Sequence, residues 1–290
     1  MPDATYAAVL ARATRDLQQA LDLDQADARL EALLFICQFY AISKASMLAR
    51  LREPAAANPG FDALLARRLR GEPVTYLLGE REFYGLALEV SPAVLIPRPE
   101  TELLVELSLE LTATNPGAAL LELGTGSGAV AIALASHRPT LSITATDVSS
   151  AALEVATRNG LRHGIPHIRW QHSDWFAALA GRTFDLIVSN PPYVAEYDPH
   201  LEQGDLRFEP RGALASGQDG LNAICIIVAD SPAFLRPGGW LLFEHGYDQG
   251  GRCRELLQRA GFSHIETRRD LAQLERVSLG QWLPSMDTRA

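Results

Sequence analysis

A glycine-rich turn at residues 124–128 is the feature of this sequence that most constrains its fold. It follows the apolar segment 118–122, which is predicted to be a buried strand, and it leads into residues 127–135, which are predicted to form a helix. Glycine permits a tight turn there, lets a ligand approach the backbone closely, and exposes the N–H groups that begin the helix. A strand, a glycine turn and a helix in this order predict a ligand-binding loop in an α/β domain.

The chain after residue 100 continues this alternation of strand-like and helix-like segments. Further strands are predicted at residues 141–146, 168–171, 184–189, 240–243, 264–268 and 276–283, and further helices at residues 149–163, 222–234 and 249–260. Such alternation predicts a mostly parallel sheet with helices on both faces. Because no long helix separates the last two strands, we expect them to pair antiparallel at one edge of the sheet.

The N-terminal part is rich in alanine, leucine and arginine, with apolar residues at helical spacing. Helices are predicted at residues 6–21, at 30–37 with an opening after Asp24 or Asp27, at 43–51, and from about 58 to near 71. In the segment that follows, aromatic and β-branched residues punctuated by glycine predict a β-hairpin or a short meander. We therefore expect a helical domain at residues 1–72, a hairpin linker at 73–98 and the α/β domain at 99–290.

Composition and charge exclude several classes of protein. With 47% hydrophobic and 21% charged residues, the chain of 290 residues has enough apolar material for a core, which excludes global disorder. It has no apolar run of about 18 residues, so no membrane-spanning helix is expected, and its first five residues do not begin a secretory signal. The net charge of −9 argues against a protein that holds nucleic acid by counterion release, although a local basic groove is compatible with it.

The cysteines and histidines predict reduced thiols and no metal site. Cys37, Cys225 and Cys253 are odd in number, far apart and without zinc-ligand spacing, which is typical of a cytosolic protein. His163 and His167 are four residues apart, but a glycine and a proline between them break any helix that could turn both rings toward one ion.

Two acidic residues frame the glycine turn. Glu122 precedes it, and Asp147 ends the next predicted strand, 19 residues after the last glycine of the turn. The spacing Gly124-x-Gly126-x-x-Ala129 also fits the dinucleotide fingerprint, and Asp147 is placed for a ribose diol with either kind of cofactor. The turn by itself therefore does not decide between NAD and S-adenosylmethionine.

Two features favour S-adenosylmethionine. An acid at Glu122 suits the cationic amino-acid end of that cofactor, which carries no diphosphate, and the acidic-x-Gly-x-Gly-x-Gly arrangement resembles that of class I methyltransferases. In that family the segment after the third strand, here Ser173–Phe176, contacts adenine. The resemblance therefore implies that Asp174 and Trp175 lie beside adenine, and a packing role is the alternative for Trp175.

The predicted strand at residues 184–189 ends in Asn190-Pro191-Pro192-Tyr193. Ligands of open α/β sheets bind at the carboxyl ends of strands, so this tetrapeptide is expected beside the glycine turn. Neither proline offers an N–H group, so the Asn190 amide oxygen and a proline carbonyl can accept two N–H bonds from one planar –NH2 group. Tyr193 supplies an aromatic wall. An ordinary turn after a strand is the alternative.

The tetrapeptide resembles that of the amino-methyltransferases, which methylate an exocyclic or amide –NH2 nitrogen. Such a nitrogen is a weak nucleophile because its lone pair is delocalised. Two acceptor bonds would hold it and favour the positive charge that grows on it as the methyl group arrives. The tetrapeptide alone leaves two substrates open, adenine in nucleic acid and a side-chain amide in protein.

A longer series of motifs resembles the peptide chain release factor glutamine methyltransferases. It comprises Gly71–Gly79, Phe83–Gly85, Ile96–Glu102, Ser189–Tyr193, Glu209-Pro210, Ala213-Leu214 and Gly217–Leu221. The resemblance runs in order over residues 71–245 and implies a class I methyltransferase (Rossmann-like) fold with a mostly parallel seven-stranded sheet. It also implies N5-methylation of the glutamine in the Gly-Gly-Gln loop of bacterial class 1 release factors. Adenine N6 in nucleic acid is the alternative acceptor.

The resemblance further implies roles for single residues. Catalytic and substrate-binding roles are implied for Asn190, Pro191, Pro192 and Tyr193. A site for S-adenosylmethionine, with S-adenosylhomocysteine as the product, is implied at Glu122, Gly124, Thr125, Gly126, Ser127, Gly128, Asp147, Asp174, Trp175 and Asn190. The implied partner is a release factor bound by the helical domain, with no nucleic acid and no membrane, and we expect a cytoplasmic monomer.

Two loop segments have two interpretations each. In the segment 96–102, either Arg98-Pro99-Glu100 covers the cofactor as a lid, with Thr101 and Glu102 starting a helix, or Pro99 is only the first-turn proline of a structural helix. The segment Glu209-Pro210-Arg211 either borders the substrate or is a plain surface loop.

Overall fold

The computed structural model describes residues 4–284 and divides into two compact units. The first unit comprises the residues up to Gly79 together with Gly204–Phe208, and the second unit comprises the rest. Residues 1–3, part of the stretch in which no secretory signal is predicted, lie outside the described residues. Within residues 4–284, no helix has the length and apolar character needed to span a membrane.

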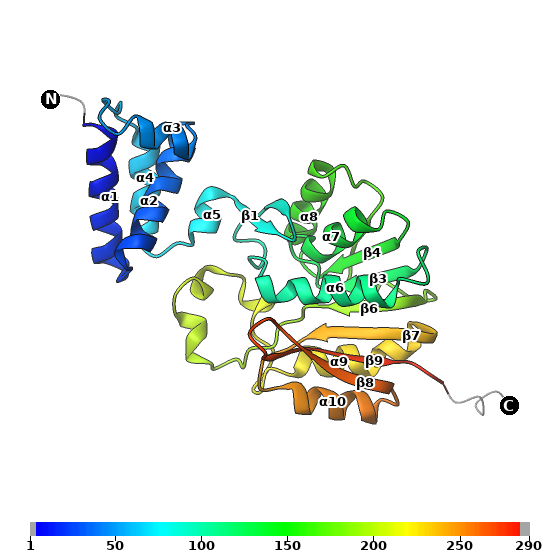
Figure 1. Cartoon of the computed structure of the whole chain (residues 1–290). Coiled ribbons are helices and arrows are strands. Elements are labelled where there is room, and N and C mark those ends of the chain that lie inside the picture. Colours follow the sequence, from blue (N-terminus) through cyan, green and yellow to red (C-terminus); the bar gives the residue numbers. More distant parts are fainter. Residues whose placement is uncertain (1–3, 285–290) are drawn as a thin grey trace. The chain divides into compact units, whose positions relative to one another are not determined.

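The first unit is a helical bundle (Figure 1). Its helices are α1 (Tyr6–Leu21), α2 (Gln25–Phe39), α3 (Lys44–Ala49), α4 (Pro59–Arg68) and α5 (Val74–Leu78), with the 3₁₀ helix η3 (Leu206–Phe208). The first four helices begin where a side-chain oxygen of Thr5, Asp24, Ser43 or Asn58 accepts a backbone N–H of the first turn. A shared apolar core and a buried ion pair between Arg68 and Glu31 (2.8 Å) hold the helices together.

The segment Pro73–Gly79 corrects a prediction, because it contains the short helix α5 where a strand of a hairpin or meander was expected. Leu77 is buried in the core of the bundle, and Val74 and Leu78 pack against that core. Burial of residues three and four apart therefore overrides the β-propensity of the segment. Gly79 ends the helix in a left-handed conformation (φ +74°), which a glycine adopts without steric cost.

The second unit contains a hairpin and a seven-stranded sheet, as the sequence predicts. The hairpin consists of β1 (Glu80–Phe83) and β2 (Leu86–Glu89). The sheet has the order β5 (Arg169–His172), β4 (Ser142–Asp147), β3 (Ala119–Leu123), β6 (Phe184–Ser189), β7 (Leu235–Glu244), β9 (Glu275–Gln281), β8 (Ser263–Arg269). The pairs from β5 to β7 are parallel, whereas β9 pairs antiparallel with both β7 and β8, so the expected antiparallel edge is confirmed.

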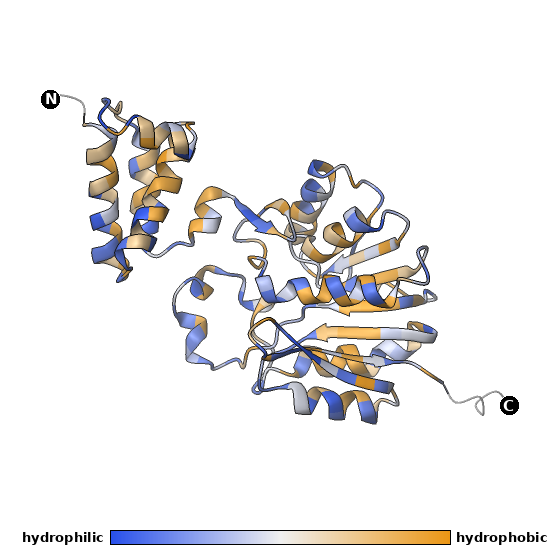
Figure 2. Ribbon diagram, in the orientation of Figure 1, coloured by the Kyte–Doolittle hydropathy of each residue, from blue (hydrophilic) through white to orange (hydrophobic). Residues whose placement is uncertain are grey.

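Helices cover both faces of this sheet (Figure 1). They are α6 (Glu102–Leu111), α7 (Ala129–His137), α8 (Ser150–Arg162), α9 (Asn222–Asp230) and α10 (Gly250–Arg259), with 3₁₀ helices at Pro99–Thr101 (η1), Pro199–Glu202 (η2), Arg211–Ala213 (η4) and Ser231–Ala233 (η5). Neighbouring strand residues alternate between two apolar clusters: Leu120 packs with α6 and α7, and Leu121 packs with α9 and α10. Figure 2 shows the resulting concentration of hydrophobic residues along the central strands.

Asn159, fully buried in α8, joins the hairpin to the glycine turn. Its side-chain amide donates to the carbonyl oxygens of Glu89 and Ser127, both at 2.9 Å. Its side-chain oxygen accepts the Glu89 N–H at 2.7 Å. A single side chain thus satisfies backbone groups of β2 and of the turn.

We expect Asn159→Ala to lower the free energy of unfolding by about 3 kcal/mol, because it leaves these buried backbone groups without their partner. Urea denaturation followed by circular dichroism measures the change. Asn115→Ala is the matched control, because Asn115 is exposed on a turn and its removal should change stability by less than about 0.5 kcal/mol. Equal stability of the two variants would contradict the role assigned to Asn159.

Candidate active site

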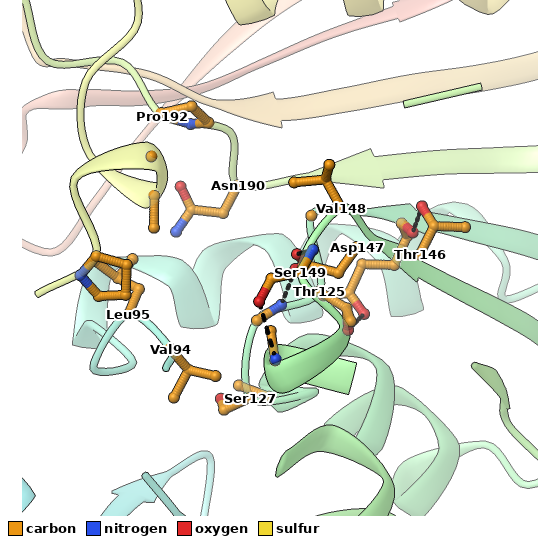
Figure 3. Close-up of a pocket in the computed structure, with 18 of the residues that line it drawn as sticks. Val94, Leu95, Thr125, Ser127, Thr146, Asp147, Val148, Ser149, Asn190 and Pro192 are labelled. Carbon is orange, nitrogen blue, oxygen red and sulfur yellow. Dashed lines mark hydrogen bonds between the residues drawn. The ribbon is translucent and has the colours of Figure 1, made fainter. Parts of the chain in front are cut away.

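The carboxyl ends of β3, β4, β5 and β6 open into a cavity of about 290 Å³ (Figure 3). From these strand ends the lining residues are Glu122, Gly124, Thr125, Gly126, Ser127, Asp147, Asp174, Trp175, Asn190 and Pro192. Two loop segments, Ala93–Pro97 and Pro210–Ala213, contribute a further part of the wall. The structure therefore brings together most of the residues that the sequence analysis singled out.

The glycine turn presents open backbone to the cavity. Gly126 has a left-handed conformation (φ +56°), and a Cβ atom built there would meet no protein atom within 4 Å. The Gly126 N–H donates to Asp147 at 2.9 Å, and the other carboxylate oxygen of Asp147 accepts the Ser149 N–H at 2.8 Å. Asp147 thus fixes the turn from the neighbouring strand, and burial raises the pKa of its carboxyl despite these bonds.

Gly128 lies at the back of the turn. A Cβ atom at this position would lie 3.0 Å from atoms of Ile132 and Trp170. The role of Gly128 in the structure is therefore to let the start of α7 pack closely against β5. A cofactor contact of Gly128, which the family resemblance implies, stays a prediction.

Glu122 is a buried carboxyl at the floor of the cavity, with 4% of its surface exposed. One of its oxygens accepts the Thr125 hydroxyl at 2.6 Å and the Ala131 N–H in the first turn of α7 at 3.2 Å. Burial outweighs these donors and raises the pKa of Glu122 to about 8. The cavity therefore contains an acid that a cationic ligand group would ionise.

Asp174 and Trp175 follow β5, and both line the cavity. Asp174 is exposed, whereas the half-buried Trp175 also packs against the apolar cluster beneath α9 and α10. The hydroxyl of Ser173 donates to the Trp175 carbonyl at 2.8 Å and holds this residue in a left-handed conformation (φ +43°). The indole thus has the packing role that the sequence left open and also lines the cavity, while its contact with adenine stays a prediction.

The tetrapeptide after β6 divides into residues that face the cavity and residues that support it. Asn190 and Pro192 line the cavity, and Figure 3 shows the Asn190 side chain directed into it. Pro191 is buried, and the Tyr193 hydroxyl donates to Glu244 at 2.9 Å. Burial and the adjacent carboxyl raise the pKa of Tyr193, so its hydroxyl stays a donor. Tyr193 therefore supports the turn, and its role as an aromatic wall for the substrate stays a prediction.

Glu209 joins the two loop segments of the wall. Its buried carboxyl accepts the Ile96 N–H at 3.1 Å and forms an ion pair with Arg98. On either side of these contacts, Pro97 and Pro210 line the cavity. The segment that contains Glu209 therefore borders the cavity, and its contact with a substrate stays a prediction.

The segment that contains Arg98 borders the cavity and begins a helix. Pro97 and Thr101 line the cavity, and a role of Arg98-Pro99-Glu100 as a lid over the cofactor stays a prediction. Pro99 opens the 3₁₀ helix η1, which leads directly into α6 at Glu102, as a first-turn proline would.

Sequence reasoning missed the contacts of Thr101 and Glu244 beside the tetrapeptide. Thr101 accepts from Asn190 at 3.0 Å and donates to Glu244 at 2.7 Å. Glu244 ends β7, so the rule that ligand groups collect at carboxyl ends of strands could have indicated it. Thr101 has no comparable signal, because it lies 89 residues from Asn190 and 143 from Glu244 in the chain.

Comparison with known proteins gives two family models and close relatives. A model described as Methyltransferase small domain matches residues 100–204, and one described as PrmC N-terminal domain matches residues 8–79. The release factor glutamine methyltransferase of Burkholderia pseudomallei is 49% identical over 275 residues, which cover 92% of this chain and 95% of that protein. The protein of the same name from Xylella fastidiosa is 53% identical over 227 residues, covering 78% and 82%.

A solved methyltransferase from Pyrococcus furiosus superposes with a TM-score of 0.51 at 20% identity, covering 74% of this chain and 96% of that one. This likeness supports the class I methyltransferase fold that the strand order already displays. The identity shared with the bacterial relatives extends over nearly the whole chain, including both units. On that evidence the chain belongs to the family of release factor glutamine methyltransferases.

Proposed function

We propose that this protein transfers a methyl group from S-adenosylmethionine to the side-chain amide nitrogen (N5) of the glutamine in the Gly-Gly-Gln motif of bacterial class 1 release factors. The observation that carries the proposal is the turn Asn190–Tyr193 at the end of β6, beside the glycine turn and in the same cavity. The names of the relatives, which align with almost the entire chain, support the choice of a release factor as substrate.

The cavity residues fit S-adenosylmethionine. Open space beside Gly126 admits a ligand to the backbone, Asp147 stands at the end of β4 where a ribose diol is held, and Glu122 offers an acid to a cationic amino-acid group. Asp174 and Trp175 can form the wall against an adenine ring. When bound, S-adenosylmethionine supplies a methyl group on a positively charged sulfur.

The tetrapeptide can hold the acceptor nitrogen. The Asn190 side-chain oxygen and the Pro191 carbonyl are the acceptors proposed for the two N–H groups of the glutamine amide. These bonds favour the positive charge that develops on nitrogen and fix it for in-line attack, a positioning effect that reaches roughly 7–11 kcal/mol in good models. The methylated amide cation is strongly acidic, so the proton leaves afterwards without a general base.

We propose that the first unit binds the release factor. Leu30 and Leu34, four residues apart on α2, are 47% and 39% exposed and form an apolar strip on the outside of the bundle. A reaction on release factors also implies a protein of the cytoplasm. The monomeric state stays a prediction.

The substrate assignment is tested by incubating the protein with methyl-labelled S-adenosylmethionine and a bacterial class 1 release factor, then mapping the label by mass spectrometry. We expect one methyl group on the glutamine of the Gly-Gly-Gln loop, and none on a release factor in which that glutamine is replaced by alanine. Duplex DNA and RNA at low salt are the competing substrates. Label on adenine and none on the release factor would overturn the proposal in favour of adenine N6.

Two variants separate the roles of the cavity residues. Asn190→Ala is expected to lower kcat by about 10²–10³-fold, because it removes an acceptor that acts on the charge of the transition state, while part of the cofactor affinity survives. Asp147→Ala is expected mainly to weaken cofactor binding. Steady-state kinetics and calorimetry with S-adenosylhomocysteine distinguish the two effects, and normal methylation by Asn190→Ala would refute the role of this residue.

Glu122 is expected to couple cofactor binding to proton release. Its pKa of about 8 leaves it mostly neutral in the free protein below that pH. Glu122 gains a cationic neighbour when the amino-acid end of S-adenosylmethionine or S-adenosylhomocysteine binds, which favours the carboxylate. Because the ligand prefers the deprotonated form, its affinity should rise with pH between about pH 6 and 7.5, by up to about tenfold per unit.

Calorimetry with S-adenosylhomocysteine in two buffers of different ionisation enthalpy measures this proton release. Glu122→Gln is the control, since its amide oxygen can still accept from Thr125 but cannot titrate. The same proton release from Glu122→Gln and from the native protein would contradict the assignment to Glu122.

A further inference from the structure

We infer that Thr101 and Glu244 are positioning residues that orient the Asn190 amide with its oxygen toward the nitrogen to be methylated. The inference rests on the proposed function and deepens it, because it names the groups that keep the Asn190 side-chain oxygen, rather than the –NH2 group, directed at the substrate.

A continuous chain of hydrogen bonds connects the three residues. The Asn190 amide nitrogen donates to the Thr101 hydroxyl at 3.0 Å, and this hydroxyl donates to one Glu244 oxygen at 2.7 Å. The other Glu244 oxygen accepts the Tyr193 hydroxyl at 2.9 Å. Glu244 at the end of β7 thus holds the first residue of the tetrapeptide through Thr101 and the last one directly.

The direction of these bonds follows from the chemistry of a carboxylate, which only accepts. The hydrogen of the Thr101 hydroxyl is committed to Glu244, so toward Asn190 this hydroxyl can only accept. It therefore selects the –NH2 end of the Asn190 amide, and the amide oxygen is left for the cavity. The two ends of an asparagine amide have nearly the same shape, so this selection comes from hydrogen bonding rather than from packing.

Burial of Thr101 and Glu244 excludes water from this chain of hydrogen bonds. Thr101 is 4% exposed and Glu244 is 1% exposed, so water cannot readily substitute for either partner. Burial raises the pKa of Glu244, while both hydroxyl donors and the positive charge of Arg276 favour its carboxylate. Raising the pH of the assay therefore favours the form of Glu244 that only accepts.

A reversed Asn190 amide would oppose the reaction. Its –NH2 group would face the –NH2 group of the substrate, so two donors would meet and one acceptor bond would be lost. Positive charge growing on the substrate nitrogen would then face N–H dipoles of the wrong sign. Loss of the orienting bonds should consequently appear in kcat more than in the affinity for either substrate.

The test compares Thr101→Val with Thr101→Ser in release-factor methylation. Thr101→Val keeps the shape and removes the hydroxyl, and we expect kcat to fall by about 10- to 100-fold, with KM for the release factor and the Kd for S-adenosylhomocysteine changed less than about threefold. Thr101→Ser restores the hydroxyl and is expected to recover most of kcat.

Thr112→Val is the matched control. Thr112 is a buried threonine at the opposite end of α6, whose hydroxyl accepts from Arg138 and donates to the Ser108 carbonyl, away from the cavity. Thr112→Val should lower the free energy of unfolding but leave kcat unchanged. An unchanged kcat in Thr101→Val, or an equal loss of kcat in Thr112→Val and Thr101→Val, would overturn the inference.

A second readout is independent of turnover. In the complex with S-adenosylhomocysteine, the side-chain –NH2 resonance of Asn190, assigned by its loss in Asn190→Ala, should exchange slowly with solvent in the native protein and faster in Glu244→Gln. Glutamine has the size of glutamate but donates at one of its two ends, so it no longer fixes the direction of the Thr101 hydroxyl. Equal exchange rates in both proteins would contradict the inference. If the native protein instead left the release factor unmethylated in the labelling assay, that result would contradict the proposed function.

Discussion

The parallel pairing of β3 with β4 on one side and β6 on the other determines where the glycine turn, Asp147 and the tetrapeptide lie. Leu123, the last residue of β3, is in register with Thr146 and Ser189. Side chains and backbone reinforce this register: the Ser189 hydroxyl donates to the Leu123 carbonyl at 2.9 Å, and the Thr125 N–H donates to the Thr146 carbonyl at 2.9 Å. The glycine turn and the tetrapeptide therefore start from fixed points of one rigid sheet.

Buried carboxyls fix the parts of the cavity wall that extend beyond the strand ends. A carboxyl that leaves water needs hydrogen-bond donors, and around this cavity the donors are the parts of the wall themselves. Glu122 binds the glycine turn and the start of α7, and Glu209 binds the segment that contains Ile96. Glu244 binds the last residue of the tetrapeptide directly and the first one through Thr101. The hydrogen bonds that satisfy each buried carboxyl thus also fix the positions of the segments that form the cavity wall.

The fold and the strand ends that form the cavity were predictable because their signals are local in the chain. The glycine turn, the alternation of strands and helices and the Asn190 turn each lie within a few residues and obey general rules of α/β sheets. The strand expected at Val74–Leu78 is wrong because burial in the bundle, which a local pattern does not reveal, favours a helix. Thr101 was missed for the same reason, because its contacts arise only when the fold brings distant segments together. Glu244, by contrast, ends β7 and could have been indicated by that position.

The left-handed backbone of Trp175 is a strain that its own packing offsets. A residue other than glycine adopts this conformation (φ +43°) at a cost of order 1–3 kcal/mol. Glycine at this position would relieve the strain, yet it would delete the indole both from the cavity wall and from the apolar cluster against which it packs. The contacts that stabilise the indole are therefore also the contacts that keep an aromatic surface at the cavity in a backbone conformation that tryptophan rarely adopts.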